Sequence, residues 1–244
     1  MRIFTKLALL GMVAVVAASS KGAIVVYDNT PLSDPNVGAV AGASEATTNV
    51  VRAMDFKIAG AASNHITDVT WWGTYLPTAV AAPVDNFTIA FYADNGSKFP
   101  QAAPISTQSV IPVRLSTGQT TFFTGTTPEF KYTASLAAPV DLNGSVLYWM
   151  SIYDTTGGAN GTYWAWRTVD SLQPGLNGDA IRNPQSATPL AWNNFHTSYA
   201  EAFQLLTVPE PTSLALLILS TPALLLRRRN RTVCTERRKV GYNP

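Results

Sequence analysis

The chain has 244 residues, of which 46% are hydrophobic and 13% are charged, with a formal net charge of +2. This length is enough for one domain with a sizeable core. The single cysteine, Cys234, excludes an intramolecular disulfide and a cysteine-based metal site. The segment Ile24–Val208 holds seven basic and thirteen acidic residues, a charge of −6, so the basic excess lies at the chain ends and does not indicate a nucleic-acid-binding face.

Residues 1–23 have the parts of a secretory signal peptide. Two basic residues precede Leu7–Ala18, an apolar run of twelve residues that is too short for a comfortable membrane span. The small residues that follow predict cleavage after Ala18 or Ser19. Cleavage after Ala23 is less suitable, because Lys21 would then stand at the −3 position. An uncleaved N-terminal anchor is the alternative.

Residues 24–207 are predicted to form an all-β domain, an antiparallel sandwich or jelly roll. Short runs rich in Val, Ile, Thr and aromatic residues are separated by clusters of Gly, Pro, Asn and Asp, and no long stretch shows helical periodicity. The predicted strands are Ile24–Tyr27, Val50–Ile58, His65–Leu76, Phe87–Ala93, Ser109–Leu115, Phe130–Leu136, Ser145–Tyr153, Thr162–Thr168 and Tyr199–Leu206.

Alternation predicts how two of these strands are buried. In one of them Phe87, Ile89 and Phe91 share a face. In Val146–Tyr153 both faces are apolar, which is typical of a central strand that is covered on both sides.

Patterns for catalysis and metal binding are weak. His65 and Asp68 should face opposite sides of a strand, which disfavours a zinc site. No Gly-x-Ser-x-Gly elbow stands at a strand-to-helix turn, and most Asp residues stand at turns, which favours neither a serine hydrolase nor a glycosidase. Structural calcium is more compatible with loop oxygens such as those of Asp28, Asp94 and Asp154, although no ligand set emerges. We predict no catalytic residue and no cofactor.

Aromatic side chains are the best candidates for ligand binding. Rings stack on sugar faces, so Trp72, Trp164 and Trp166 are predicted sugar-stacking residues if they are exposed. Of the adjacent Trp71 and Trp72, one should face inwards and the other outwards. The competing interpretation is that these rings fill the core of a domain without disulfides, and burial of all three predicted residues would count against sugar binding.

The C-terminal stretch Val208–Arg229 joins a rigid corner, an apolar run and a basic block. The run Thr212–Leu226 has no charge, and as a helix its fifteen residues would extend over roughly 22 Å, short of a hydrocarbon core of about 30 Å. A basic block after such a run marks the cytoplasmic side. The corner consists of Pro209, Glu210 and Pro211, and the block consists of Arg227, Arg228 and Arg229.

This ordered combination resembles the PEP-CTERM sorting signal of exported bacterial proteins. The resemblance implies recognition by an exosortase, a membrane enzyme, and processing near Pro209–Pro211. Residues 230–244 form a basic tail that the family pattern does not include. The stretches Ile66–Gly73 and Phe87–Gly96 are similar to the sandwich-like cargo domains of such proteins, which transfer no active site. An ordinary C-terminal anchor is the alternative.

The expected protein is a non-catalytic exported protein of the cell surface or extracellular matrix. Its expected parts are a signal peptide (1–23), a β domain (24–207), a sorting and transmembrane segment (208–229) and a basic cytoplasmic tail (230–244). Its expected partners are an exosortase-type enzyme, the inner membrane and extracellular polysaccharide, with no nucleic acid. A carbohydrate-binding module or adhesin is the alternative, and a secreted hydrolase, which needs two facing carboxylates, is a third candidate.

Overall fold

The computed structural model describes residues 22–31, 41–48, 50–60, 63–77, 84–121, 127–157, 161–169, 176–182, 192–196 and 200–208. Ala23–Val208 form a compact unit of their own. Within the described ranges, no helix has the length and apolar character needed to cross a membrane. Apart from residues 22, 23 and 208, the predicted signal peptide, the sorting and transmembrane segment and the basic tail lie outside the described residues.

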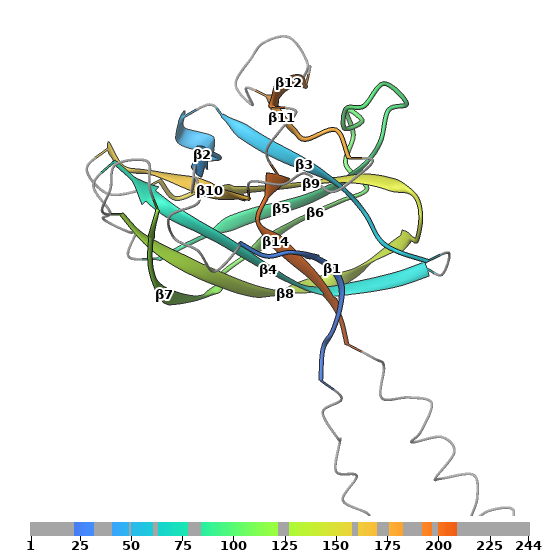
Figure 1. Ribbon diagram of the computed structural model, residues 1–244, viewed down its shortest axis with the longest axis horizontal. Coiled ribbons are helices and arrows are strands. Elements are labelled where there is room, and N and C mark those ends of the chain that lie inside the picture. The colour runs from blue at the N-terminus through green and yellow to red at the C-terminus, as the bar shows by residue number, and fades with distance from the viewer. Residues whose placement is uncertain are drawn as a thin grey trace, which may run out of the picture. The chain divides into compact units, whose positions relative to one another are not determined.

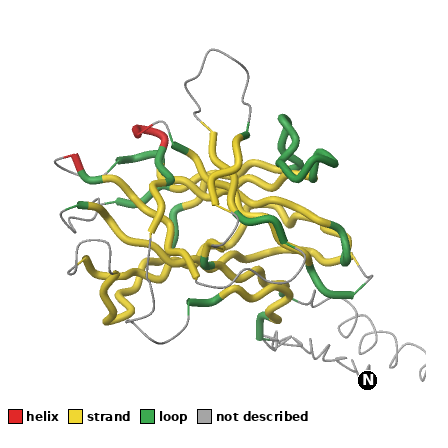
Figure 2. The backbone as a smooth tube through the Cα atoms, turned by 45° about the horizontal axis from the view of Figure 1, so that its top comes forward, coloured by secondary structure: helices red, strands yellow, loops and turns green. Residues whose placement is uncertain are grey.

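The domain is built from antiparallel strands arranged in two sheets (Figure 1). Helical residues in the described part are confined to short turns such as η1 (Ala46–Thr48), and the rest consists of strands and the loops that join them (Figure 2). The strands are β1 (Ile24–Asn29), β2 (Ala41–Ala43), β3 (Val51–Lys57), β4 (Ser63–Leu76), β5 (Phe87–Ala93), β6 (Ser106–Val110), β7 (Val113–Thr121), β8 (Thr127–Asn143), β9 (Leu147–Asp154), β10 (Tyr163–Val169), β11 (Asp179–Arg182), β12 (Asn193–His196), β13 (Ala200–Glu201) and β14 (Phe203–Thr207).

The first sheet follows the order β1-β14-β4-β10-β13, with β2 paired to β10, β8 paired to β4 and β7 paired to β8. The second follows the order β12-β11-β3-β9-β5-β6. The first and last strands are neighbours, because Ile24 pairs with Thr207 and Val25 with Leu206. The chain therefore enters and leaves the domain at the same end of one sheet.

The all-β prediction is confirmed, and most predicted strands are present. The predicted strand Ser109–Leu115 is wrong, because the chain divides there into β6 and β7 around Pro112, which cannot donate to a sheet ladder. The short strands β2, β11 and β12 were not predicted from the sequence. Strand β8 extends well beyond the predicted Phe130–Leu136 and reaches seventeen residues.

One aromatic-rich core joins the inner faces of the two sheets. Trp71 of β4 stacks on Tyr132 of β8 at 5.5 Å between ring centres, and Phe87 of β5 meets Trp71 edge-on at 5.3 Å. Large rings packed in this way contribute contact area and favourable geometry together. Phe87, Ile89 and Phe91 all lie in this core, as their alternation predicted.

The prediction that the strand around residue 150 is covered on both faces is confirmed. Strand β9 lies between β3 and β5 in the second sheet. Met150 and Ile152 face the main core, whereas Trp149 belongs to a second apolar cluster that includes Tyr92 and Trp192.

Gly73 makes room for one of the tryptophan rings of the core. A Cβ atom at this position would lie 2.5 Å from Cζ2 of Trp164, a rigid ring that is fully buried. We expect Gly73→Ala to lower the free energy of unfolding by about 1–3 kcal/mol, because the core is already filled. Urea denaturation measures this loss. Gly22→Ala is the control, since no atom lies within 4 Å of its added Cβ, and equal effects of the two substitutions would contradict the packing argument.

Candidate functional site

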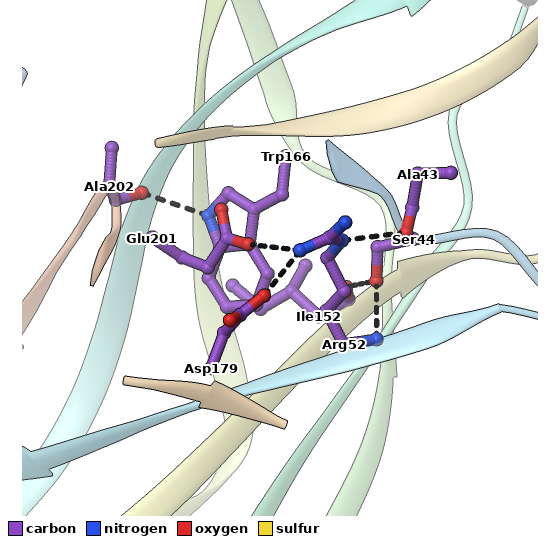
Figure 3. A network of polar contacts seen from close by, with 8 residues as sticks. All are labelled: Ala43, Ser44, Arg52, Ile152, Trp166, Asp179, Glu201 and Ala202. Carbon is purple, nitrogen blue, oxygen red and sulfur yellow. Dashed lines mark hydrogen bonds and ion pairs between the residues drawn. The ribbon is translucent and has the colours of Figure 1, made fainter. Parts of the chain in front are cut away.

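The most concentrated group of buried charges is centred on Arg52 of β3. Its Nη1 atom donates to Oδ2 of Asp179 on β11 and lies 3.4 Å from Oε1 of Glu201 on β13 (Figure 3). Its Nε atom donates to the carbonyl oxygen of Ala43 on β2 at 3.1 Å. Strands β3 and β11 belong to the second sheet and β13 to the first, so this side chain ties the two sheets together.

The backbone beside Arg52 is shaped to receive its guanidinium group. A Cβ atom on Gly42 would lie 2.0 Å from Cζ of Arg52, so any larger residue there would displace the guanidinium group from its present position. Ser44 adds a second tie, because its Oγ accepts a hydrogen bond from the Arg52 amide at 3.1 Å and donates to the Ile152 carbonyl at 2.6 Å. Strand β2 and the residue after it are thus held against the second sheet.

The Arg52 cluster is closed to solvent. The side chains of Arg52, Asp179 and Glu201 are 8%, 2% and 1% exposed. Burial raises the pKa of Glu201 well above its ordinary value; the charge of Arg52 opposes this rise and that of Asp179 adds to it. Among the described residues, the Oε2 atom of Glu201 finds no hydrogen-bond partner. This arrangement is therefore an internal ion cluster.

A second polar network lies at the C-terminal end of β4. The Tyr75 hydroxyl lies 2.5 Å from Oδ1 of Asp85 and 3.1 Å from Oδ2 of Asp154, so it donates to a pair of buried carboxylates. Arg114 donates to Asp85 at 2.9 Å. Burial raises the pKa of Asp85, while the hydrogen bond from Tyr75 and the charge of Arg114 lower it. Oδ1 of Asp154 accepts from the amide and hydroxyl of Thr156, at 3.0 and 2.7 Å, as in a turn.

Asp55 of β3 fixes a loop on the outer face of the second sheet. Its carboxylate accepts from the Asn177 amide at 2.6 Å, from Nδ2 of Asn177 at 3.0 Å and from the Gly178 amide at 3.2 Å. Burial raises the pKa of Asp55 to about 6, although the three donors favour the ionised form and lower it. Desolvation of the carboxylate is therefore the larger effect.

We expect Asp55 to make stability depend on pH. Its folded pKa of about 6 exceeds the ordinary 3.8, so the folded state binds more protons between these values. The stabilisation is complete below about pH 4 and is lost as the pH rises through 6; its size is on the order of 3 kcal/mol. Urea unfolding of the wild type and Asp55→Asn from pH 4 to 7 tests this, and a pH-independent difference between the two proteins would contradict it.

The comparison with known families gives one match. Residues 25–211 match the family described as a domain of unknown function, DUF7901. The chain belongs to the DUF7901 family. No curated protein matches the chain. The DUF7901 match begins one residue after the start of β1 and extends past β14 to Pro211, so it covers the strands of the described domain except for Ile24.

The structure of the DUF7901 domain buries the three predicted sugar-stacking residues. Trp164 and Trp166 are fully buried, and Trp72 is 6% exposed. Trp71 is also fully buried, so neither member of the adjacent pair is exposed to solvent. Trp72 belongs to the core cluster, and Nζ of Lys131 lies 5.6 Å from its ring centre. None of the three predicted rings presents the free face that sugar stacking requires.

The predicted geometry of His65 and Asp68 is also corrected. The register between β4 and β8 shifts between Ile66 and Asp68, and both Ile66 and Val69 point into the core. This bulge adds one residue to the alternation and places His65 and Asp68 on the same outer face. They nevertheless bind different partners: His65 pairs with Asp141, and Asp68 accepts from the Ser135 hydroxyl at 2.5 Å.

The loop carboxylates considered for calcium are engaged in turns. Asp28 accepts from the Thr30 amide at 3.0 Å, and Asp94 accepts from the Gly96 amide at 2.8 Å and from Nε1 of Trp149 at 3.0 Å. In the described part of the chain, no three His, Cys, Asp or Glu side chains are grouped so that they could hold a metal ion.

The predicted sorting residues Pro209, Glu210 and Pro211 and the basic cluster Arg227, Arg228 and Arg229 lie outside the described residues. Conversely, sequence reasoning did not find the Arg52 cluster. One signal was present: Arg52 stands between Val51 and Ala53 in a strand that is mostly apolar, and a charged residue at such a position needs a buried partner.

Proposed function

We propose that this protein is a non-catalytic exported protein, delivered to the cell envelope, surface or extracellular matrix through a C-terminal PEP-CTERM-type signal. The pairing of β1 with β14 carries the proposal. The first paired residue, Ile24, directly follows the signal-like segment, and its partner Thr207 stands two residues before Pro209. A domain closed in this way would keep its sheets after processing on either side.

The chemistry of the domain supports a non-catalytic role. Buried charged side chains of the domain bind one another or the backbone. Arg52 pairs with Asp179, and Nε of Arg167 lies 2.9 Å from Oε2 of Glu129. Such pairs stabilise a particular arrangement of strands when all partners are present. The alternative of a carbohydrate-binding module loses support, because Trp72, Trp164 and Trp166 are buried.

The sorting proposal is tested by replacing Pro209, Glu210 and Pro211 together with alanine in the native host. We expect the triple variant to keep residues 227–244 and to stay in the inner-membrane fraction, while the wild type is recovered without residues 227–244 in the outer envelope or the medium. Lys57→Ala, an exposed substitution within the domain, is the control for export. Identical processing of the triple variant and the wild type would refute the proposal.

A further inference from the structure

The end of the domain where the chain enters and leaves carries exposed apolar side chains. Ile24 is 53% exposed, Val25 is 44% exposed and Val208 is 41% exposed. Their backbones are neighbours, because Ile24 pairs with Thr207, the residue before Val208. Ile24 and Val25 are successive strand residues and point to opposite faces, so apolar side chains lie on both faces of this end of the sheet. The Val208 amide donates to Oγ1 of Thr67 at 3.0 Å, so the folded structure extends to the last residue before the Pro-Glu-Pro corner. We name Ile24, Val25 and Val208 the exit patch.

The chain leaves little room between the exit patch and a membrane. Only three residues separate Val208 from Thr212, the first residue of the uncharged apolar run. Four Cα-to-Cα steps extend over at most about 14 Å. The headgroup layer on each side of a bilayer is roughly 6 Å thick. If Thr212 is at the hydrocarbon boundary, the exit patch must therefore be in the headgroup layer or just outside it.

The short length of the apolar run reduces the distance between the exit patch and the membrane further. As a helix, Thr212–Leu226 would extend over roughly 22 Å, against about 30 Å of hydrocarbon. A short span is accommodated by local thinning of the bilayer or by drawing its flanking residues inwards. Both responses bring the domain closer to the lipid.

We propose that the exit patch lies in the lipid headgroup layer while the C-terminal apolar run is inserted in the bilayer. This inference rests on the proposed function, since it requires the run to enter a membrane. Apolar contact drives the docking, and charge does not, because Ile24–Val208 has a formal charge of −6 and would be repelled by anionic lipid. The matching surface is a zwitterionic bilayer.

The experiment uses the exported chain with its C-terminus intact, purified from a host that lacks exosortase. A Val25→Cys substitution in a Cys234→Ser background receives an environment-sensitive fluorophore, and the protein is reconstituted into phosphatidylcholine vesicles that contain spin-labelled lipid. We expect strong quenching and a blue shift of the emission. Ser97→Cys is the matched control, because it lies on the β5–β6 connection of the other sheet, which Figure 1 draws away from the start of β1. It should show neither effect.

Flotation of the vesicles separates the two proposals. If the protein does not float with the vesicles, the membrane segment fails and the docking proposal falls with it. If it floats but the Val25 label behaves like the Ser97 label, only docking is overturned. Adding Ile24→Asp and Val208→Asp to the Val25-labelled protein should reduce quenching severalfold without changing flotation, because charged side chains leave the headgroup layer. Unchanged quenching would also contradict the docking proposal.

Discussion

Arg52→Ala is expected to lower the free energy of unfolding by about 3–5 kcal/mol, because it leaves the carboxylates of Asp179 and Glu201 buried without their shared cation. Loss of the bond from Nε to the Ala43 carbonyl adds to the cost. Urea denaturation followed by tryptophan fluorescence measures the change. Lys57→Ala on the same strand is the matched control; its side chain is exposed, and we expect a change within about 0.5 kcal/mol.

A second variant separates charge from packing at this site. Replacing Arg52 with Met, Asp179 with Asn and Glu201 with Gln removes all three charges while keeping similar volumes. The triple variant should be more stable than Arg52→Ala, because no buried charge is left without a partner. Two results would show that the cluster does not hold the two sheets together as described. One is a loss of less than about 1 kcal/mol of unfolding free energy in Arg52→Ala, and the other is a triple variant that is less stable than Arg52→Ala.

Trp164→Ala is expected to cost about 3–5 kcal/mol of unfolding free energy, the range for removing a large aromatic ring from a core. The ring meets Phe87 edge-on at 4.9 Å between centres, lies 6.2 Å from Tyr132 and covers the bare backbone of Gly73. Its removal leaves a cavity bordered by rigid rings and by a glycine, neither of which can extend into it.

Thermal and urea unfolding of Trp164→Ala provide the measurement. Tyr163→Ala is the control, because Tyr163 is the neighbouring residue on β10 and is only partly buried. The substitution at Trp164 should have clearly the larger effect. A loss no greater than that of Tyr163→Ala would mean that Trp164 does not fill the core, and would reopen its interpretation as a binding residue.

The alternation of apolar residues correctly predicted the burial of strands in which the strand's own side chains determine which face is buried. The alternation of Phe87, Ile89 and Phe91 and the two apolar faces of β9 are properties of single strands, and both predictions are confirmed. Strand β2 carries only Ala and Gly, which have no β preference, and it forms because β10 pairs with it and Arg52 lies across Gly42.

The Arg52 cluster depends on contacts between distant parts of the chain. Arg52 meets Asp179 and Glu201 across separations of 127 and 149 residues, and no spacing rule joins such positions. The bulge in β4 is another feature that local alternation does not reveal, and it reverses the expected facing of Asp68. The burial of Trp72 depends on its membership of the core cluster, which a strict alternation with Trp71 does not predict.

Intact mass spectrometry of the protein from its native host, with and without exosortase, tests the central claim most directly. We predict an N-terminus after Ala18 or Ser19 in both hosts. With the enzyme, the C-terminus should lie near Pro209–Pro211; without it, Arg227–Pro244 should be retained. A C-terminus that still carries Arg227–Pro244 in both hosts would contradict the account.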